Sequence, residues 1–183
     1  MLLNSCGSKR ISKKIIVASS GKIESLDPAR ANTLKAMQLI SSLGDTLYEL
    51  NSNGELIPEL ASGMPIISKD RLKIVINLRK NVFFHDGTSF NSNAIKFTFD
   101  RFKRIGTMNY ILGNKIKSIE TPSEYSVIIN LNKPSSSING LLTSVNLTPI
   151  SPTFYQEYSD KFLNEKFVGT GKYVLSSFSN EVQ

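Results

Sequence analysis

The chain of 183 residues has little of what disulfide frameworks and metal sites need, with one cysteine, Cys6, and one histidine, His85. A single cysteine excludes an internal disulfide, and no set of Cys and His residues has metal-ligand spacing. No run of about 20 apolar residues is present to span a bilayer. Hydrophobic residues at 40% and charged residues at 20% are ordinary globular values. The composition therefore predicts a folded chain that needs neither a metal nor another cofactor.

Bases exceed acids, with 22 Lys plus Arg against 15 Asp plus Glu and a formal charge of +7. These bases are spread along the sequence, and the densest cluster is RFKRIG at 101–106. A diffuse excess of this kind is more typical of a solvated surface than of a nucleic-acid interface. The cluster is interpreted as a solvated helix face, and a basic nucleic-acid-binding domain is kept as an alternative.

The context of Cys6 is MLLNSCGSK, with Leu3 three residues before it and Ser5 one residue before it. This arrangement resembles a bacterial lipobox, after which the cysteine becomes a lipidated first residue. A signal of this type carries an apolar stretch of about 7–15 residues, of which only MLL is present. Two interpretations stay open: Cys6 is lipidated and the start lies upstream, or Cys6 is a free thiol in a frayed terminus.

Alternating apolar residues predict strands in several places. In the second of two strands expected in IISKDRLKIVINLRK at 66–80, one face carries Leu72, Ile74, Ile76 and Leu78. The turn signal Asn53-Gly54 predicts a hairpin. The other strands are expected at 13–20, at 124–132 and after the glycines of 167–178.

Three- and four-residue spacing predicts helices. One begins after Asn32 or Thr33 and has an apolar face of Leu34, Met37, Ile40, Leu43 and Leu47. A second covers 91–104, is capped near Asn91 or Ser92 and places Ile95, Phe99 and Phe102 in the core. A weak helix is expected at 135–145, and a better one at 151–162 that begins with Ser151 and Pro152.

The stretch NVFFHDGTSF at 81–90 places His85 directly beside Asp86. Adjacent side chains on an extended segment point to opposite faces, so the pair is a poor catalytic signal. Asp86-Gly87 after a strand is a strong turn signal. The sequence predicts a turn. Phe83 is expected to pack inward, and Phe84 is a second candidate for the same role. A hydrolase that uses His85 with Asp86 is the alternative.

Five segments, taken in order, resemble one family. They are SLDPA at 25–29, LYELNSNGELIPELASG at 47–63, LKIVINLRKNVFFHDGTSFNSNAIKFTFDR at 72–101, PISP at 149–152 and VGTGKYVL at 168–175. They are similar to the N-terminal part of the bacterial extracellular solute-binding proteins, family 5, which serve peptide, oligopeptide and nickel ABC importers. The resemblance covers nearly all of 14–178. The family's common GTGPY form is GTGKY here, with Lys172 in place of proline.

The resemblance implies a mixed α/β (α+β) fold of the periplasmic-binding-protein-like class II (cluster C) type, present in part. Such a protein has two lobes that close around a ligand by hinge motion and hands the ligand to a membrane permease. Residues 1–12 are expected to be a residual signal and tether. Part of the first lobe is expected at 13–46 and 167–183, and its inserted subdomain at 47–166. We expect this chain to lack the rest of the first lobe and the whole second lobe. The acidic residue that pairs with the amino terminus of a peptide ligand lies in that missing part.

Family members place the loop after SLDPA against the ligand, which maps onto Ala31, Asn32, Thr33 and Leu34. An equal interpretation is that Asn32 and Thr33 cap the following helix, and the two are compatible. Tyr110 is a second candidate, for the cleft wall. The implied partners are a peptide or related small solute, permease subunits of an ABC transporter and, through a lipid on Cys6, a membrane surface. The expected location is periplasmic or extracytoplasmic, and the expected protein is a binding protein rather than an enzyme.

Overall fold

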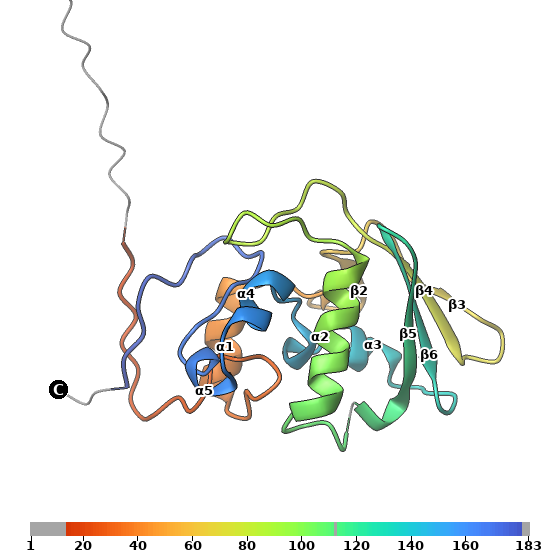
Figure 1. The fold of residues 1–183 in the computed structure, drawn as a ribbon. Coiled ribbons are helices and arrows are strands. Elements are labelled where there is room, and N and C mark those ends of the chain that lie inside the picture. Colours follow the sequence, from red (N-terminus) through yellow and green to blue (C-terminus); the bar gives the residue numbers. More distant parts are fainter. Residues whose placement is uncertain (1–13, 112, 181–183) are drawn as a thin grey trace, which may run out of the picture.

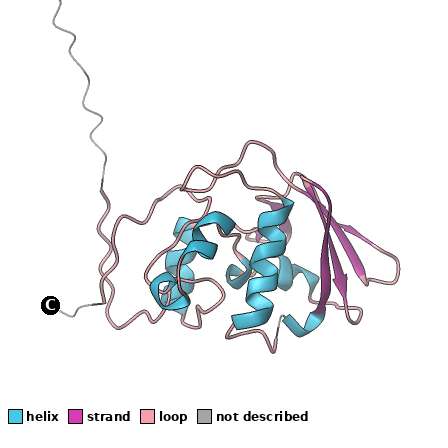
Figure 2. Ribbon diagram, in the orientation of Figure 1, coloured by secondary structure: helices cyan, strands magenta, loops and turns pink. Residues whose placement is uncertain are grey.

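The computed structural model of the chain describes residues 14–111 and 113–180, so Cys6 lies outside the described part (Figure 1). Helices and strands are mixed along the sequence (Figure 2). The helices are α1 (Leu34–Leu43), α2 (Ser92–Ile105), α3 (Ile138–Leu142), α4 (Pro152–Glu157) and α5 (Asp160–Leu163), with short 3-10 turns η1 (Gly113–Lys115) and η2 (Val145–Leu147). The strands are β1 (Tyr48–Leu50), β2 (Leu56–Pro58), β3 (Ile66–Ile67), β4 (Lys73–Asn77), β5 (Ile116–Ser123) and β6 (Ser126–Leu131).

An antiparallel sheet of four strands, in the order β3-β4-β6-β5, carries the larger core. Its register pairs Ile74 with Ile129 and Ile76 with Val127, all of them buried. The alternation expected in β4 and β6 is thus confirmed. The strand β5 was not predicted, because only Ile116 and Ile119 in it are buried and its other side chains are mostly polar.

Helix α2 packs against β5 and β6 and, on its other side, meets α4. Figure 1 shows it standing between the sheet and the group of α1, α4 and α5. The expected cap is confirmed, since the Asn91 side chain accepts hydrogen bonds from the backbone N–H groups of Asn93 and Ala94. Ile95, Phe99 and Phe102 are buried as predicted.

A second core cluster joins α1 to α4 and α5. Thr33 caps α1 by accepting a hydrogen bond from Ala36 N. The predicted apolar face is partly wrong, because Leu34 is 71% exposed and Leu47 lies beyond the helix end, in the larger core. The buried face is made of Ala36, Ile40 and Leu43. The predicted division of the chain at 46/47 and 166/167 stays a prediction.

Two predicted strands do not form. Segments 14–20 and 172–178 are drawn as loops in Figure 2. Most of their β-branched and aromatic side chains are exposed, at 63–83% for Ile15, Ile16 and Val17 and 52–64% for Tyr173 and Val174, whereas Phe178 is partly buried against the second core cluster. The physical reason is that, in the part of the chain that the structure describes, no strand lies beside either segment to accept ladder hydrogen bonds.

The helix expected at 151–162 is two helices, since Tyr158 has extended backbone angles that end α4 before α5 begins. Its start is as predicted: Ser151 caps the N-terminus and Pro152 is the first helical residue. The weak helix expected at 135–145 forms as the single turn of α3. Every helix among the described residues is too short or too polar to cross a membrane.

The 81–90 stretch is a tight turn, as predicted. Phe84 N donates to Thr88 O and Gly87 N to Phe84 O, both at 2.9 Å, and Gly87 has φ +83°. The prediction for the two phenylalanines is half wrong, because Phe84 is buried and Phe83 is 55% exposed. Alternation along the extended segment lets only one of the pair face the core.

Candidate functional site

The loop at residues 25–33, called here the SLDPA loop, leads into α1. Asp27 organises it, because its carbonyl oxygen accepts hydrogen bonds from Arg30 N and Ala31 N, both at 2.9 Å. Its carboxylate Oδ1 accepts a third from Ala29 N at 3.1 Å. The backbone N–H groups of residues 29–31 are therefore all satisfied by one aspartate.

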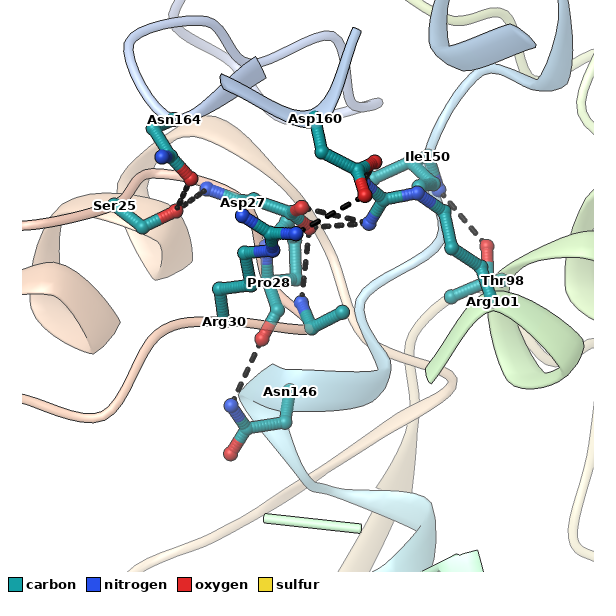
Figure 3. A network of polar contacts seen from close by, with 11 residues as sticks. Ser25, Asp27, Pro28, Arg30, Thr98, Arg101, Asn146, Ile150, Asp160 and Asn164 are labelled. Carbon is teal, nitrogen blue, oxygen red and sulfur yellow. Dashed lines mark hydrogen bonds and ion pairs between the residues drawn. The ribbon is translucent and has the colours of Figure 1, made fainter. Parts of the chain in front are cut away.

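A buried ion pair fixes that aspartate (Figure 3). Nη1 of Arg101 donates to Asp27 Oδ1 at 2.7 Å and lies 2.7 Å from Oδ2. The Arg101 side chain is 3% exposed and that of Asp27 is 0% exposed. Burial raises the pKa of the Asp27 carboxyl above its ordinary value, while Arg101 and the Ala29 amide act in the opposite direction.

Asp160, the first residue of α5, joins a second arginine to this pair. Its Oδ1 accepts from Nη2 of Arg101 at 3.1 Å, and its Oδ2 accepts from Nη2 of Arg30 at 3.0 Å. The ring of Tyr155 lies 5.3 Å from the Arg101 guanidinium. The network therefore connects the SLDPA loop, α2, α4 and α5.

The interpretation of 101–106 as a solvated helix face is wrong for Arg101, which is buried, although Arg104 is exposed. A signal was present in the sequence. Ala94, Thr98, Arg101 and Ile105 follow one another at four- and three-residue spacing, so Arg101 stands on the inward face of α2. Its partner Asp27, 74 residues earlier, could not be identified from that spacing.

Asn146 of η2 supports the loop from the other side. Its Nδ2 donates to Pro28 O at 2.8 Å and to Ala31 O at 2.7 Å, and its side chain is buried. Thr107 N donates to Ala29 O at 3.0 Å. The loop is thus held by side chains and backbone from α2, η2 and the turn after α2, and sequence reasoning identified none of these contacts.

An open pocket of about 330 Å³ lies beside the loop. Its lining is polar apart from one isoleucine and includes one acid and one base: Glu24, Ser25, Arg30, Asn32, Ile105, Thr107 and Asn164.

The predicted ligand residues occupy different places. Ala31 is 1% exposed and belongs to the second core cluster, Asn32 lines the pocket, and Thr33 caps α1. Leu34 is 71% exposed and Tyr110 is 69% exposed, and neither lines the pocket. Among the predicted residues, Asn32 alone belongs to the pocket wall.

His85 and Asp86 point to different partners. The ring nitrogen Nε2 of His85 lies 2.8 Å from Gly171 O, and since a carbonyl only accepts, Nε2 carries the hydrogen. Asp86 Oδ2 accepts from the Ser151 hydroxyl, and Oδ1 accepts from the N–H and hydroxyl of Thr88. Desolvation raises the pKa of Asp86, but these hydrogen bonds outweigh it and lower the pKa below its usual value. The serine is thus bonded to the carboxylate and the histidine to a carbonyl, which is not the geometry of a hydrolytic triad.

Comparisons with known proteins agree on one family. The model of the bacterial extracellular solute-binding proteins, family 5 Middle, matches residues 55–183. A glutathione-binding protein GsiB of Salmonella choleraesuis (strain SC-B67) is 30% identical over 169 residues, which are 91% of this chain and 33% of that protein. The chain therefore spans about a third of the length of the curated relatives it matches.

Two solved structures have the same fold. The substrate-binding domain of an oligopeptide ABC transporter from Bacillus anthracis str. Ames superposes with a TM-score of 0.82 at 18% identity, over 90% of this chain and 35% of that one. The periplasmic binding protein DppA from Helicobacter pylori, in complex with the peptide STSA, superposes with a TM-score of 0.72 at 27% identity. The match covers 85% of this chain and 35% of that one. Because the family model covers most of the sequence and the fold is the same, this chain belongs to the bacterial extracellular solute-binding proteins of family 5.

Proposed function

We propose that this chain is the ligand-binding component, or part of it, of an ABC importer for peptides or related small solutes. The observation that carries the proposal is the firmly held SLDPA loop beside an open pocket lined mostly by polar and charged residues. Relatives named for binding glutathione and for transporting oligopeptides support the class of ligand. The relatives are binding proteins, so we propose no enzymatic activity.

The pocket chemistry suits a peptide-like ligand. Glu24 and Arg30 offer one charge of each sign, as a molecule with an amino and a carboxyl group requires. The Asn32 side chain is exposed and provides both a donor and an acceptor. The N-terminus of α1 follows directly, and although Thr33 caps its Ala36 N–H, a helix N-terminus still favours ligand oxygens.

The remaining expectations are proposals as well. We assign 13–46 and 167–183 to part of a first lobe and 47–166 to its inserted subdomain. We further propose delivery to permease subunits from an extracytoplasmic position. Lipid attachment at Cys6 is proposed on the sequence alone, because this residue lies outside the described part of the structure.

Amide chemical-shift mapping with a mixture of di- to pentapeptides, and separately with glutathione, tests the proposal. We expect weak binding, because the chain spans only about a third of its relatives, with shifts concentrated around the pocket, at residues 24–25, 30–32, 105–107 and 164. Asn32→Ala should reduce these shifts, whereas Asn53→Ala, an exposed asparagine at the β1–β2 turn, should not. Shifts that avoid the SLDPA loop at millimolar ligand would refute the assignment.

A further inference from the structure

We infer that Asp27 and Arg101 are positioning residues: their buried ion pair sets the conformation of the SLDPA loop and thereby the place of Asn32 in the pocket. The inference rests on the proposed function, in which this loop receives the ligand. It assigns a role to two residues that do not themselves line the pocket.

Stability alone does not account for this ion pair. Both side chains are almost completely buried, and the cost of removing two charges from water commonly exceeds their mutual attraction. Apolar residues of similar size at such positions are often as stabilising or more so. A charge pair adds geometric specificity, because the carboxylate and the guanidinium form hydrogen bonds only in a defined relative orientation.

Arg101 has that geometry imposed by three neighbours. Its two terminal nitrogens bind two different carboxylates, of Asp27 and Asp160, and the ring of Tyr155 lies against its guanidinium. The planar guanidinium group can make all three of these contacts at the same time. A lysine in the same position has a single charged nitrogen and cannot reproduce the pattern.

The geometry passes from Arg101 to the loop through Asp27. One oxygen of the Asp27 carboxylate accepts from both Arg101 and Ala29 N, and the carbonyl of the same residue accepts from Arg30 N and Ala31 N. A displacement of Asp27 therefore releases three consecutive amides. The next residue is Asn32, so its side chain moves with them.

The pocket arginine is tied to the same network. Arg30 lines the pocket and is held by Asp160, whose other oxygen binds Arg101. Two side chains of the pocket, from positions 30 and 32, thus depend on one buried guanidinium.

Site-resolved amide hydrogen exchange of the whole chain tests the inference. Arg101→Lys should speed exchange at the amides of Ala29, Arg30 and Ala31 about tenfold, while Ile129 in the central sheet keeps its rate. Arg104→Lys, an exposed arginine of the same helix, should leave all these rates unchanged.

Three outcomes are distinguishable. Unchanged rates at residues 29–31 overturn the inference, and so does a uniform rise that includes the sheet, since that reports a general loss of stability. If Arg101→Lys does not fold, Asp160→Asn removes only the outer carboxylate, and a rise of about threefold confined to the loop is expected.

The exchange measurement uses no ligand, so it separates the inference from the proposed function. If the wild-type loop shows no shifts with peptide, the proposed function fails, while the exchange rates still decide whether Arg101 positions the loop. If both hold, peptide-induced shifts at Asn32 should be smaller in Arg101→Lys than in the wild type.

Discussion

Replacement of Arg101 by methionine removes the charge while retaining an unbranched stem of related length. It leaves the Asp27 carboxylate without its partner, at a site where that side chain is 0% exposed. Removing one member of a buried pair costs about 3–5 kcal/mol of unfolding free energy. The cost should lie toward the lower figure, because Asp27 can take up a proton and become neutral.

The pH dependence has a definite sign. Burial raises the pKa of Asp27, and Arg101 is the largest influence that lowers it. In the variant, the pKa of Asp27 in the folded state therefore rises further above its pKa in the unfolded state. At pH values between these two pKa values, the folded state binds more protons than the unfolded state. Stability of the variant is then highest at low pH and is lost as the pH rises through that window. Its deficit relative to the wild type should be larger at pH 7 than at pH 5.

Urea unfolding followed by far-UV circular dichroism, at both pH values, measures these differences. Arg104→Met should change stability by less than about 0.5 kcal/mol, because that side chain is exposed. The double variant Arg101→Met with Asp27→Asn should lose less than the sum of the single variants, with a coupling of about 1–3 kcal/mol. The reasoning is wrong if Arg101→Met costs under about 1 kcal/mol, if its cost does not depend on pH, or if the two single effects add.

Two further predictions concern the contacts around the 81–90 turn and the glycine segment. Asp86→Asn should destabilise the protein at pH 7 and progressively less at acid pH. The lowered pKa of Asp86 contributes stability that is present above the unfolded pKa and lost as the pH falls through the folded value. A difference in unfolding midpoint that stays the same as the pH falls from neutral into the acid range would contradict this. Gly171→Ala should cost about 1–3 kcal/mol in urea unfolding, because a Cβ there would lie 2.5 Å from the backbone carbonyl carbon at the end of α1. Gly63→Ala, with nothing within 4 Å of the added carbon, is the matched control and should be close to neutral.

Local patterns predicted much of the central fold. The alternating apolar residues of β4 and β6 and the capped, amphipathic α2 were expected at nearly their observed positions, because each pattern is contained within a few turns or strand residues. The same reasoning failed for 14–20 and 172–178. Their residues have high β propensity, but a strand also needs ladder hydrogen bonds to another strand, and neither segment belongs to a sheet of the described residues.

The candidate site was predicted less well than the fold. The resemblance directed attention to residues 31–34, of which Asn32 reaches the pocket, while Ala31 is buried and Leu34 points to solvent. Asp27 and Arg101 were missed as a pair. A carboxylate and a guanidinium separated by 74 residues have no local pattern that connects them.

By itself, the sequence determined the periodicity of β4, β6 and α2, the turn at Asp86-Gly87, the N-terminal caps of α1, α2 and α4, and the family. These features depend on backbone preferences and on hydrogen bonds between residues a few positions apart. The tertiary structure alone decided that Arg101 is buried against Asp27, that His85 meets Gly171, and that β5 joins the sheet. Burial and pairing across long sequence separations depend on which surfaces the fold brings together, and no short segment contains that information.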